Sequence, residues 1–231
     1  LLRDADTAMY RAKAQGRSQC QVFDPSMHAS AIERLTMETQ MRRALERQEF
    51  SVAYQPIIQL DSNDVCGFEA LARWERADGT TTYPAEFIPI AEETGLIVPL
   101  TNWVLTEACR QVAEWQRAFD RPLTLTVNIS ARLFDRPTLV DEVRQAIADS
   151  GLLPRTLRLE ITESFLANGS DAVVQRLDEL RSIPVELYLD DFGTGFSSLS
   201  YLHRYRLDAL KIDQSFISRM GGVFNDSPIV S

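Results

Sequence analysis

The spacing of apolar positions along the chain changes near Phe50. Before this residue, apolar side chains recur every three or four positions, which predicts amphipathic helices. After it, short runs in which apolar and polar residues alternate are separated by longer stretches with helical spacing. Strands that alternate with helices of this length predict βαβ units, so we expect an α/β fold with a mainly parallel sheet.

The alternating runs predict six strands. They are Phe50–Leu60, Val65–Trp74, Leu123–Ser130, Thr156–Glu163, Val185–Asp191 and Leu207–Asp213. The helical stretches between and after them are Pro84–Glu93, Pro99–Phe119, Arg136–Ser150, Asp171–Ser182 and Gln214–Met220. Because only the short turn 61–64 joins the first two strands, we expect that pair to be antiparallel.

The residues before Phe50 predict a separate, helical part of the chain. Residues 1–18 have helical spacing and 19–23 predict a short strand, together too small to bury a core of their own. A longer helix follows, with an apolar stripe made of Met27, Ala31, Leu35, Met41 and Leu45. This pattern favours a linker helix that packs on a neighbouring domain, with a signalling helix that pairs with a second subunit as the alternative.

Composition narrows the class of protein. The chain has 231 residues, 45% hydrophobic and 25% charged, as in ordinary globular proteins. Neither a signal peptide nor an apolar run of about 18 residues is present, so we expect a cytoplasmic segment without membrane contact. Anchoring of a longer parent protein through N-terminal regions outside this chain stays open. The three cysteines lack a CxxC spacing, which predicts neither a disulfide framework nor a zinc site.

Charge excludes one class of partner. The net charge is −9, and residues 1–46 hold seven Lys and Arg against six Asp and Glu, so the acidic excess lies in the rest of the chain. Binding to DNA requires clustered basic residues, and we therefore expect no DNA partner. A phosphate substrate remains compatible with this charge if metal ions supply the positive charge.

Polar side chains gather at the carboxyl ends of the predicted strands. In a parallel α/β barrel these ends meet at one rim, which is where active sites lie. Any one of these residues is explained more simply as a solvated loop end or a salt bridge, but the whole set is not. The candidates are Glu69, Asn128, Glu160, Glu163, Asp190, Asp191, Lys211 and Asp213.

The chemistry of these side chains points to metal ions. Many carboxylates at one rim require a counter-charge, and oxygen ligands without His or Cys select Mg²⁺ or Mn²⁺, with Ca²⁺ as an alternative. The adjacent Asp190 and Asp191 suit two metals, an arrangement that promotes attack of water on a phosphodiester. We expect Lys211 to hold that water or to stabilise charge on the phosphate. Glu69 and Arg73 share one strand face, so an ion pair between them is the alternative.

Six ordered motifs together resemble the EAL family of cyclic-di-GMP phosphodiesterases. They lie at residues 54–57, 69–74, 127–130, 160–164, 190–195 and 210–213, and the resemblance runs from about Leu45 to the end of the chain. Residues 5–17 resemble the closing helix of a GGDEF (diguanylate cyclase) domain, without its signature loop. We therefore expect a GGDEF remnant at 1–24, a linker helix at 25–47 and a C-terminally truncated EAL domain at 48–231.

The resemblance implies a TIM-type barrel, with about six of its eight strands in this chain, and hydrolysis of cyclic di-GMP to pGpG. It implies two Mg²⁺ or Mn²⁺ ions, with Ca²⁺ inhibitory, bound by Glu69, Asn128, Glu160, Asp190 and Asp191. It implies catalytic roles for Glu69, Glu163, Lys211 and Asp213, with Glu163 bracing the mobile loop Phe192–Leu199. It implies substrate contacts from Gln55, Leu71 and Arg73.

The family pattern continues through two more strand–helix units, which carry a further metal-binding glutamate. Because the chain stops at Ser231, we expect it to hydrolyse cyclic di-GMP poorly by itself. Two alternatives stay open: a silent cyclic-di-GMP receptor, and an unrelated Mg²⁺-dependent barrel enzyme. We expect an upstream GGDEF or sensor domain in a longer bacterial signalling protein, and the sequence leaves a homodimer open.

Overall fold

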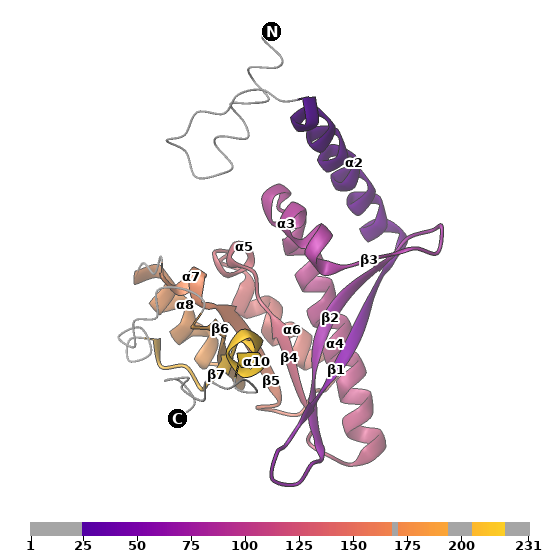
Figure 1. Ribbon diagram of the computed structural model, residues 1–231. Coiled ribbons are helices and arrows are strands. Elements are labelled where there is room, and N and C mark those ends of the chain that lie inside the picture. The colour runs from indigo at the N-terminus through magenta and orange to yellow at the C-terminus, as the bar shows by residue number, and fades with distance from the viewer. Residues whose placement is uncertain (1–24, 168–170, 194–204, 220–231) are drawn as a thin grey trace. The chain divides into compact units, whose positions relative to one another are not determined.

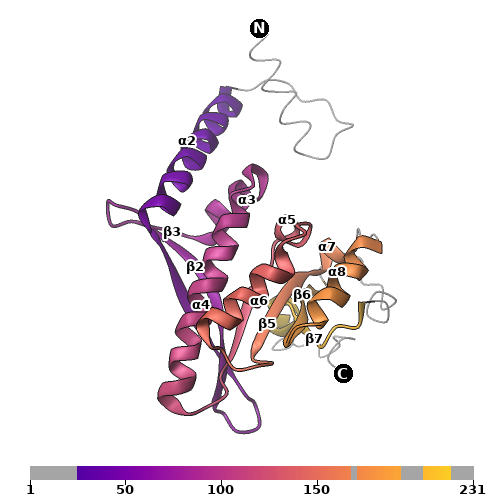
Figure 2. The same ribbon diagram turned by 180° about the vertical axis from the view of Figure 1, so that it is seen from behind.

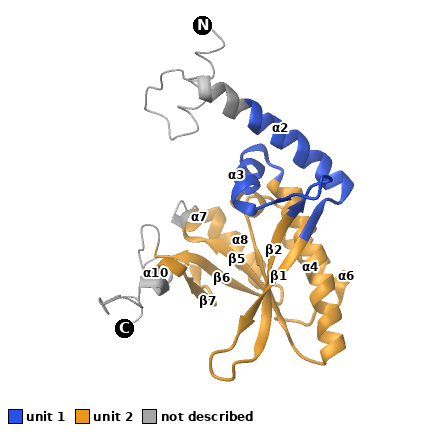
Figure 3. Ribbon diagram, turned by 45° about the vertical axis from the view of Figure 1, so that its right-hand side comes forward, with its two compact units in different colours: residues 1–51, 74–96 blue, residues 52–73, 97–231 orange. Residues whose placement is uncertain are grey.

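The computed structural model describes residues 25–167, 171–193 and 205–219 (Figure 1). The predictions for residues 1–24, and for the loop beyond Gly193, lie outside the described residues. The chain divides into two compact units, one of residues 1–51 and 74–96 and the other of residues 52–73 and 97–231 (Figure 3). In the described part of the chain, no helix is long and apolar enough to cross a membrane.

A mainly parallel sheet forms the centre of the second unit, as predicted. Its strands follow one another in the order β1 (Phe50–Ile58), β2 (Val65–Glu75), β4 (Thr124–Asn128), β5 (Leu157–Thr162), β6 (Val185–Phe192) and β7 (Ala209–Ile212). Every neighbouring pair from β2 onward is parallel. The turn between β1 and β2 is closed by the Gln59 N–H, which donates to the Asp64 carbonyl, and this short connection makes the pair antiparallel.

Helices cover one face of this sheet (Figures 1 and 2). They are α4 (Ile97–Phe119), α6 (Leu139–Ser150) and α8 (Asp171–Arg181). Side chains alternate along each strand, and those toward the helices are apolar and fully buried, as at Leu125, Leu159 and Leu187. The polar residues at alternate positions therefore share the opposite face, which in a barrel is the interior.

Three short elements and two helix starts differ from the predictions. The structure adds β3 (Thr81–Thr82), α5 (Ala131–Phe134) and α7 (Glu163–Ala167), and α6 begins at Leu139 rather than Arg136. The helix α10 (Gln214–Arg219) begins where it was predicted. The strand β4 ends early because the Ser130 side chain accepts the Leu133 N–H and begins α5. The helix α4 begins two residues before Pro99, since proline is tolerated in a first turn.

The first unit packs two helices around an aromatic core. It holds α2 (Pro25–Arg47), α3 (Pro84–Thr94) and β3, with Phe50, Trp74 and Phe87 in mutual ring contact. Met41 and Ala44 of α2 are completely buried, whereas Leu35 is 64% exposed. The predicted stripe is therefore wrong at Leu35, because six residues rotate a helix by about 120° away from the buried side.

Candidate active site

The polar face of the sheet brings side chains from four neighbouring strands together. In the register, Glu69 of β2 pairs with Thr126, Asn128 of β4 pairs with Glu160, and Thr162 pairs with Asp190 of β6. Gly67 permits the close approach of β2 to β4, since a Cβ at this residue would lie 1.9 Å from the Thr124 hydroxyl. These registers place four of the predicted metal ligands on the same face of four neighbouring strands.

Lys211 lies at the centre of the predicted carboxylates. Its Nζ is 2.8 Å from Glu69 Oε2, 2.9 Å from Glu160 Oε2 and 3.6 Å from Asp190 Oδ1. The Asn128 side chain joins the same group by donating from Nδ2 to Glu69 Oε1 at 3.0 Å. Strands β2, β4, β5, β6 and β7 thus each contribute one side chain to a connected cluster, which we call the carboxylate cluster.

Burial and mutual repulsion set the charges in the carboxylate cluster. Burial raises the pKa of the Glu160 carboxyl to about 7, although the hydrogen bond from Lys211 acts in the opposite direction. Burial would lower the pKa of Lys211, but its hydrogen bonds to Glu69 and Glu160 outweigh this and hold the pKa above its ordinary value. Lys211 is therefore a cation at neutral pH, and Glu160 is the carboxylate that most needs a positive neighbour.

Asp190 and Asp191 both interact electrostatically with this cluster, although they are adjacent on one strand. Neighbouring residues of a regular strand point to opposite faces. Here the pairing of β6 with β7 shifts between Leu189 and Phe192, and Asp191 has a left-handed backbone with φ of 55°. Burial and the nearby charges of Asp190 and Asp213 raise the pKa of Asp191, as expected for carboxylates gathered around one point.

Glu163 contacts the start of the predicted mobile loop. Its Oε2 accepts the Gly193 N–H at 2.9 Å, while its Oε1 is buried without a hydrogen-bond partner among the described residues. Gly193 has φ of 98°, a conformation that favours glycine. This contact is at the one loop position beyond Phe192 that the structure describes, and the bracing role stays a prediction.

The predicted substrate-binding residues lie apart from the cluster's hydrogen bonds. Arg73 Nη1 donates to the Ala72 carbonyl at 2.8 Å, while the Glu69 carboxylate bonds to Asn128 and Lys211, so the alternative Glu69–Arg73 pair is not formed. Gln55 is exposed on β1 and Leu71 is partly buried on β2.

Asp213 begins the helix that follows β7. Its Oδ1 accepts the Ser215 N–H at 2.9 Å. Hydrogen bonds from the Ser215 side chain and backbone hold the pKa of Asp213 below its ordinary value. The carboxylate thus caps α10, an ordinary structural role, and its charge also acts on Asp191.

The cluster has the donor chemistry of a divalent-cation site. Three carboxylate oxygens, from Glu69, Glu160 and Asp190, already converge on one positive nitrogen. In the ranges that the structure describes, no three acidic, His or Cys side chains are spaced as a ready metal site. Hard oxygen donors fit Mg²⁺ or Mn²⁺, provided that the Lys211 ammonium moves from the centre.

A second polar layer, which the sequence analysis did not identify, lies beside the carboxylates. Arg158 Nε is 3.0 Å from Glu186 Oε2, and its guanidinium carbon lies 5.1 Å from the centre of the Tyr188 ring. Tyr188 Oη donates to Glu186 Oε2 at 3.2 Å. The sequence signal for this layer is a polar residue at every second position of two otherwise apolar strands.

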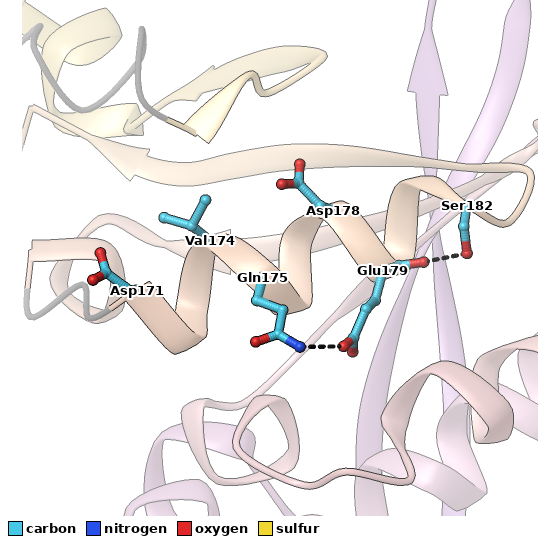
Figure 4. A pocket seen from close by; sticks show the side chains of 6 residues that line it. All are labelled: Asp171, Val174, Gln175, Asp178, Glu179 and Ser182. Atoms are coloured by element: carbon cyan, nitrogen blue, oxygen red, sulfur yellow. Dashed lines mark hydrogen bonds between the residues drawn. The ribbon is translucent and has the colours of Figure 1, made fainter.

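A pocket on α8 is separate from these residues. Figure 4 shows that its lining comes from successive turns of this helix and from Ser182 just after it, with Gln175 donating to Glu179. Asp178, which also lines it, forms an ion pair with Arg181 at 2.7 Å. None of the predicted site residues lines this pocket, and we assign it no role.

Comparisons with known proteins give the family and several relatives. The family model described as "EAL domain" matches residues 38–230. The chain is 42% identical over all its 231 residues to "Bifunctional diguanylate cyclase/cyclic di-GMP phosphodiesterase MucR" of Pseudomonas aeruginosa, of which it covers 34%. It is also 42% identical over 217 residues to "Cyclic di-GMP phosphodiesterase NbdA" of the same organism, covering 94% of this chain and 28% of NbdA.

Solved structures give the same result. The structure described as "PaMucR Phosphodiesterase, c-di-GMP complex" is similar with a TM-score of 0.78 and 40% identity, over 84% of this chain and 79% of that chain. The chain spans about a third of the length of the curated relatives that it matches.

Proposed function

The chain belongs to the EAL domain family, and on this premise we propose that it is part of a phosphodiesterase that hydrolyses cyclic di-GMP to pGpG. The carboxylate cluster carries the proposal, since five strands deliver Glu69, Asn128, Glu160, Asp190 and Lys211 to one group. The names of MucR and NbdA support the reaction, and the PaMucR complex supports the ligand.

We further propose that two divalent cations, Mg²⁺ or Mn²⁺, belong to this site. Glu69, Asn128, Glu160 and Asp190 would hold one cation, and Asp190 with Asp191 would hold the other. When bound, such cations polarise a phosphoryl oxygen and lower the pKa of a bound water. Ca²⁺ has the same donor preference with a looser geometry, so we expect it to bind without supporting hydrolysis.

We also propose roles for other residues of the predicted site. Lys211 is held in its charged form, and an ammonium released from Glu69 and Glu160 would donate to the attacking oxygen or to the phosphate. Arg73 is not paired with Glu69, and its guanidinium donates from Nη1 to the neutral Ala72 carbonyl. Its positive charge would therefore be available to a phosphate oxygen. We assign substrate contacts to Gln55 and Leu71 as well.

Two residues would organise the site around the substrate. Glu163 already accepts the Gly193 N–H and would fix the loop Phe192–Leu199 beside the aspartates. Asp213 is oriented by its bond to the Ser215 N–H and would add a further carboxylate close to Asp191.

The surroundings of the domain are also proposed. We propose a GGDEF remnant at 1–24, a linker helix at 25–47 and the EAL domain at 48–231, in a longer cytoplasmic signalling protein with a GGDEF or sensor domain upstream. MucR, which is named bifunctional and is about three times longer, supports this arrangement. A homodimer formed through the linker helix is compatible with this arrangement.

The test is hydrolysis of cyclic di-GMP with Mn²⁺ by a protein that continues beyond Ser231. We expect Glu69→Gln to reduce turnover at least about 100-fold, because it removes a charged ligand from the cluster. Glu75→Gln is the matched control, since Glu75 lies on the same strand but is exposed and bonds to Ser51, and we expect less than a twofold change.

The alternative function has a distinct outcome. A silent receptor would bind cyclic di-GMP but show no turnover with Mg²⁺ or Mn²⁺, even without mutation. Equal turnover by Glu69→Gln and the unmutated protein would instead contradict the assignment of the site.

A further inference from the structure

We propose that Glu186 is a positioning residue, which holds the Arg158 guanidinium away from Glu160 and so keeps the Glu160 carboxylate available to a divalent cation. This inference rests on the proposed metal-dependent function. It concerns the polar layer of Arg158, Glu186 and Tyr188, which lies one step along the strands from the carboxylate cluster.

Strand geometry puts Arg158 within reach of the cluster. Arg158 and Glu160 are two residues apart on β5, so they share one face and are separated by about 6.6 Å along the strand. In the register of β5 and β6, Arg158 pairs with Glu186 and Glu160 pairs with Tyr188. An arginine side chain is long enough to cover this separation, and Glu160 is the nearest buried carboxylate on its own strand.

The observed contacts direct the guanidinium to Glu186 instead. Arg158 Nε lies 3.0 Å from Glu186 Oε2, and the Tyr188 ring lies beneath the guanidinium at 5.1 Å. The Tyr188 hydroxyl donates to the same Glu186 oxygen at 3.2 Å, which orients the carboxylate toward Arg158. Ion pair, ring stacking and hydrogen bond therefore hold Arg158 in one position.

The charges explain why this position matters. Glu160 is only 4% exposed and already accepts a hydrogen bond from Lys211 at 2.9 Å. A second cation without its own partner would bind Glu160 or repel a metal ion, and partly buried charges interact strongly because water screens them poorly. Glu186 neutralises the charge of Arg158. Among the described residues of the cluster and of the polar layer, Lys211 is therefore the one cation that a metal ion must displace.

This role predicts an asymmetry between the two partners of the ion pair. Removing Glu186 leaves Arg158 unpaired beside the cluster and weakens cation binding. Removing Arg158 as well takes away the competing charge and restores binding. A salt bridge that only stabilised the fold would make the double variant no better than the single variant.

The experiment titrates Mn²⁺ into the metal-free chain, with calorimetry or the electron paramagnetic resonance of free Mn²⁺ as the readout. We expect Glu186→Gln to weaken Mn²⁺ binding by at least about tenfold, the usual effect of an outer-shell residue on a metal site. We expect Arg158→Gln/Glu186→Gln to bind within about threefold of the unmutated chain. Thermal unfolding of each metal-free variant reports any loss of fold separately.

The chain offers a closely matched control pair on α8. Arg176 Nη1 and Glu179 Oε2 are 2.7 Å apart, with side chains 20% and 39% exposed, against 20% and 34% for Arg158 and Glu186. We expect Glu179→Gln to change Mn²⁺ affinity by less than about twofold, since this pair lies on a covering helix.

Each outcome decides one of the two proposals. If the unmutated chain binds no Mn²⁺, the proposed metal-dependent function fails. If it binds Mn²⁺ and Glu186→Gln binds equally well, or the double variant stays as weak as the single one, the role of Glu186 fails while the function stands. Should Glu186→Gln not fold, Arg158→Gln alone decides the matter, because a tenfold loss in that variant would overturn the proposal.

Discussion

The ammonium of Lys211 offsets the negative charges of one buried carboxylate, Glu160, and two partly buried ones, Glu69 and Asp190. Glu160 is almost completely buried, and isolated charges in such places are strongly disfavoured. The ammonium lies within 2.9 Å of both Glu69 and Glu160, which offsets part of their desolvation. The same atoms that would bind a metal are therefore occupied by a cation from the chain itself.

The raised pKa of Glu160 makes the metal-free protein less stable as pH rises. The folded state keeps the Glu160 proton up to a pH of about 7, whereas the unfolded chain loses it near the ordinary glutamate pKa of 4.5. The folded state thus binds more protons between these values, and the free energy of unfolding falls across this window by up to about 3 kcal/mol. Above about pH 7 both states are ionised and this contribution no longer changes.

Urea denaturation with EDTA from pH 4.5 to 8 measures this effect. We expect Glu160→Gln, which cannot ionise, to lose much less stability than the unmutated chain over that range. Parallel curves for the two proteins would show that Glu160 titrates normally. Added Mn²⁺ should restore stability to the unmutated chain near pH 7 and less to the variant.

At the scale of elements, the close approach of β2 to β4 depends on one glycine. A Cβ at Gly67 would lie 1.9 Å from the Thr124 hydroxyl and 2.4 Å from the Thr124 carbonyl oxygen, and a backbone oxygen cannot simply rotate away. The same two strands carry Glu69 and Asn128, which are joined by a hydrogen bond of 3.0 Å. Strand spacing and site geometry are therefore linked.

We expect Gly67→Ala to destabilise the chain by about 2 kcal/mol, the usual cost of overpacking, and also to weaken Mn²⁺ binding. Gly79→Ala is the control, because Gly79 has φ of 82° with nothing within 4 Å of an added Cβ. It should cost about 1–2 kcal/mol through backbone strain alone and leave Mn²⁺ affinity unchanged. Calorimetric Mn²⁺ titration and urea denaturation separate the two effects, and equal Mn²⁺ affinities would contradict the link.

Within the first unit, Arg76 binds α2 to the residues around it. The Arg76 guanidinium lies 4.6 Å from the centre of the Trp74 ring, and its three nitrogens donate to Thr82 Oγ1 at 2.7 Å, Gln40 Oε1 at 2.9 Å and Met37 Sδ at 3.3 Å. Two of these partners belong to α2. This set of contacts, with the buried Met41 and Ala44, fixes the second half of that helix.

We expect Arg76→Ala to speed amide hydrogen exchange in α2 from residue 37 to 44, because it removes a stacked cation and two bonds to that helix. The loss should amount to about 1–2 kcal/mol of local opening free energy. Arg42→Ala is the control, since Arg42 is 60% exposed and pairs within α2 with Glu38. Unchanged exchange in Arg76→Ala would mean that apolar packing alone holds the helix.

At the scale of the whole molecule, every predicted site residue lies in the second unit, of residues 52–73 and 97–231. We therefore expect deletion of residues 1–24 to change cyclic-di-GMP affinity in the presence of Ca²⁺ by less than about threefold. Fluorescence anisotropy with a labelled cyclic dinucleotide measures this. A tenfold loss would show that residues 1–24 contribute to the ligand site.

The sequence alone determined the order and type of most elements, because alternation and helical spacing are local properties. It also determined which residues gather at one edge, since parallel strands share a direction: Glu69, Asn128, Glu160, Asp190 and Lys211 were all expected there. Short elements such as α5 and α7 were missed, because capping by Ser130 and the end of β5 override a simple period.

Only the tertiary structure determined which charged side chains pair with each other. Glu69 and Arg73 share a strand face, yet Glu69 bonds to Asn128 and to Lys211, which is 142 residues away in the chain. The exposure of Leu35, the backbone of Asp191 and the pairing of Arg158 with Glu186 likewise depend on neighbours brought by other strands or helices. Pairing is set by distance and burial in the folded chain, and a linear pattern contains neither.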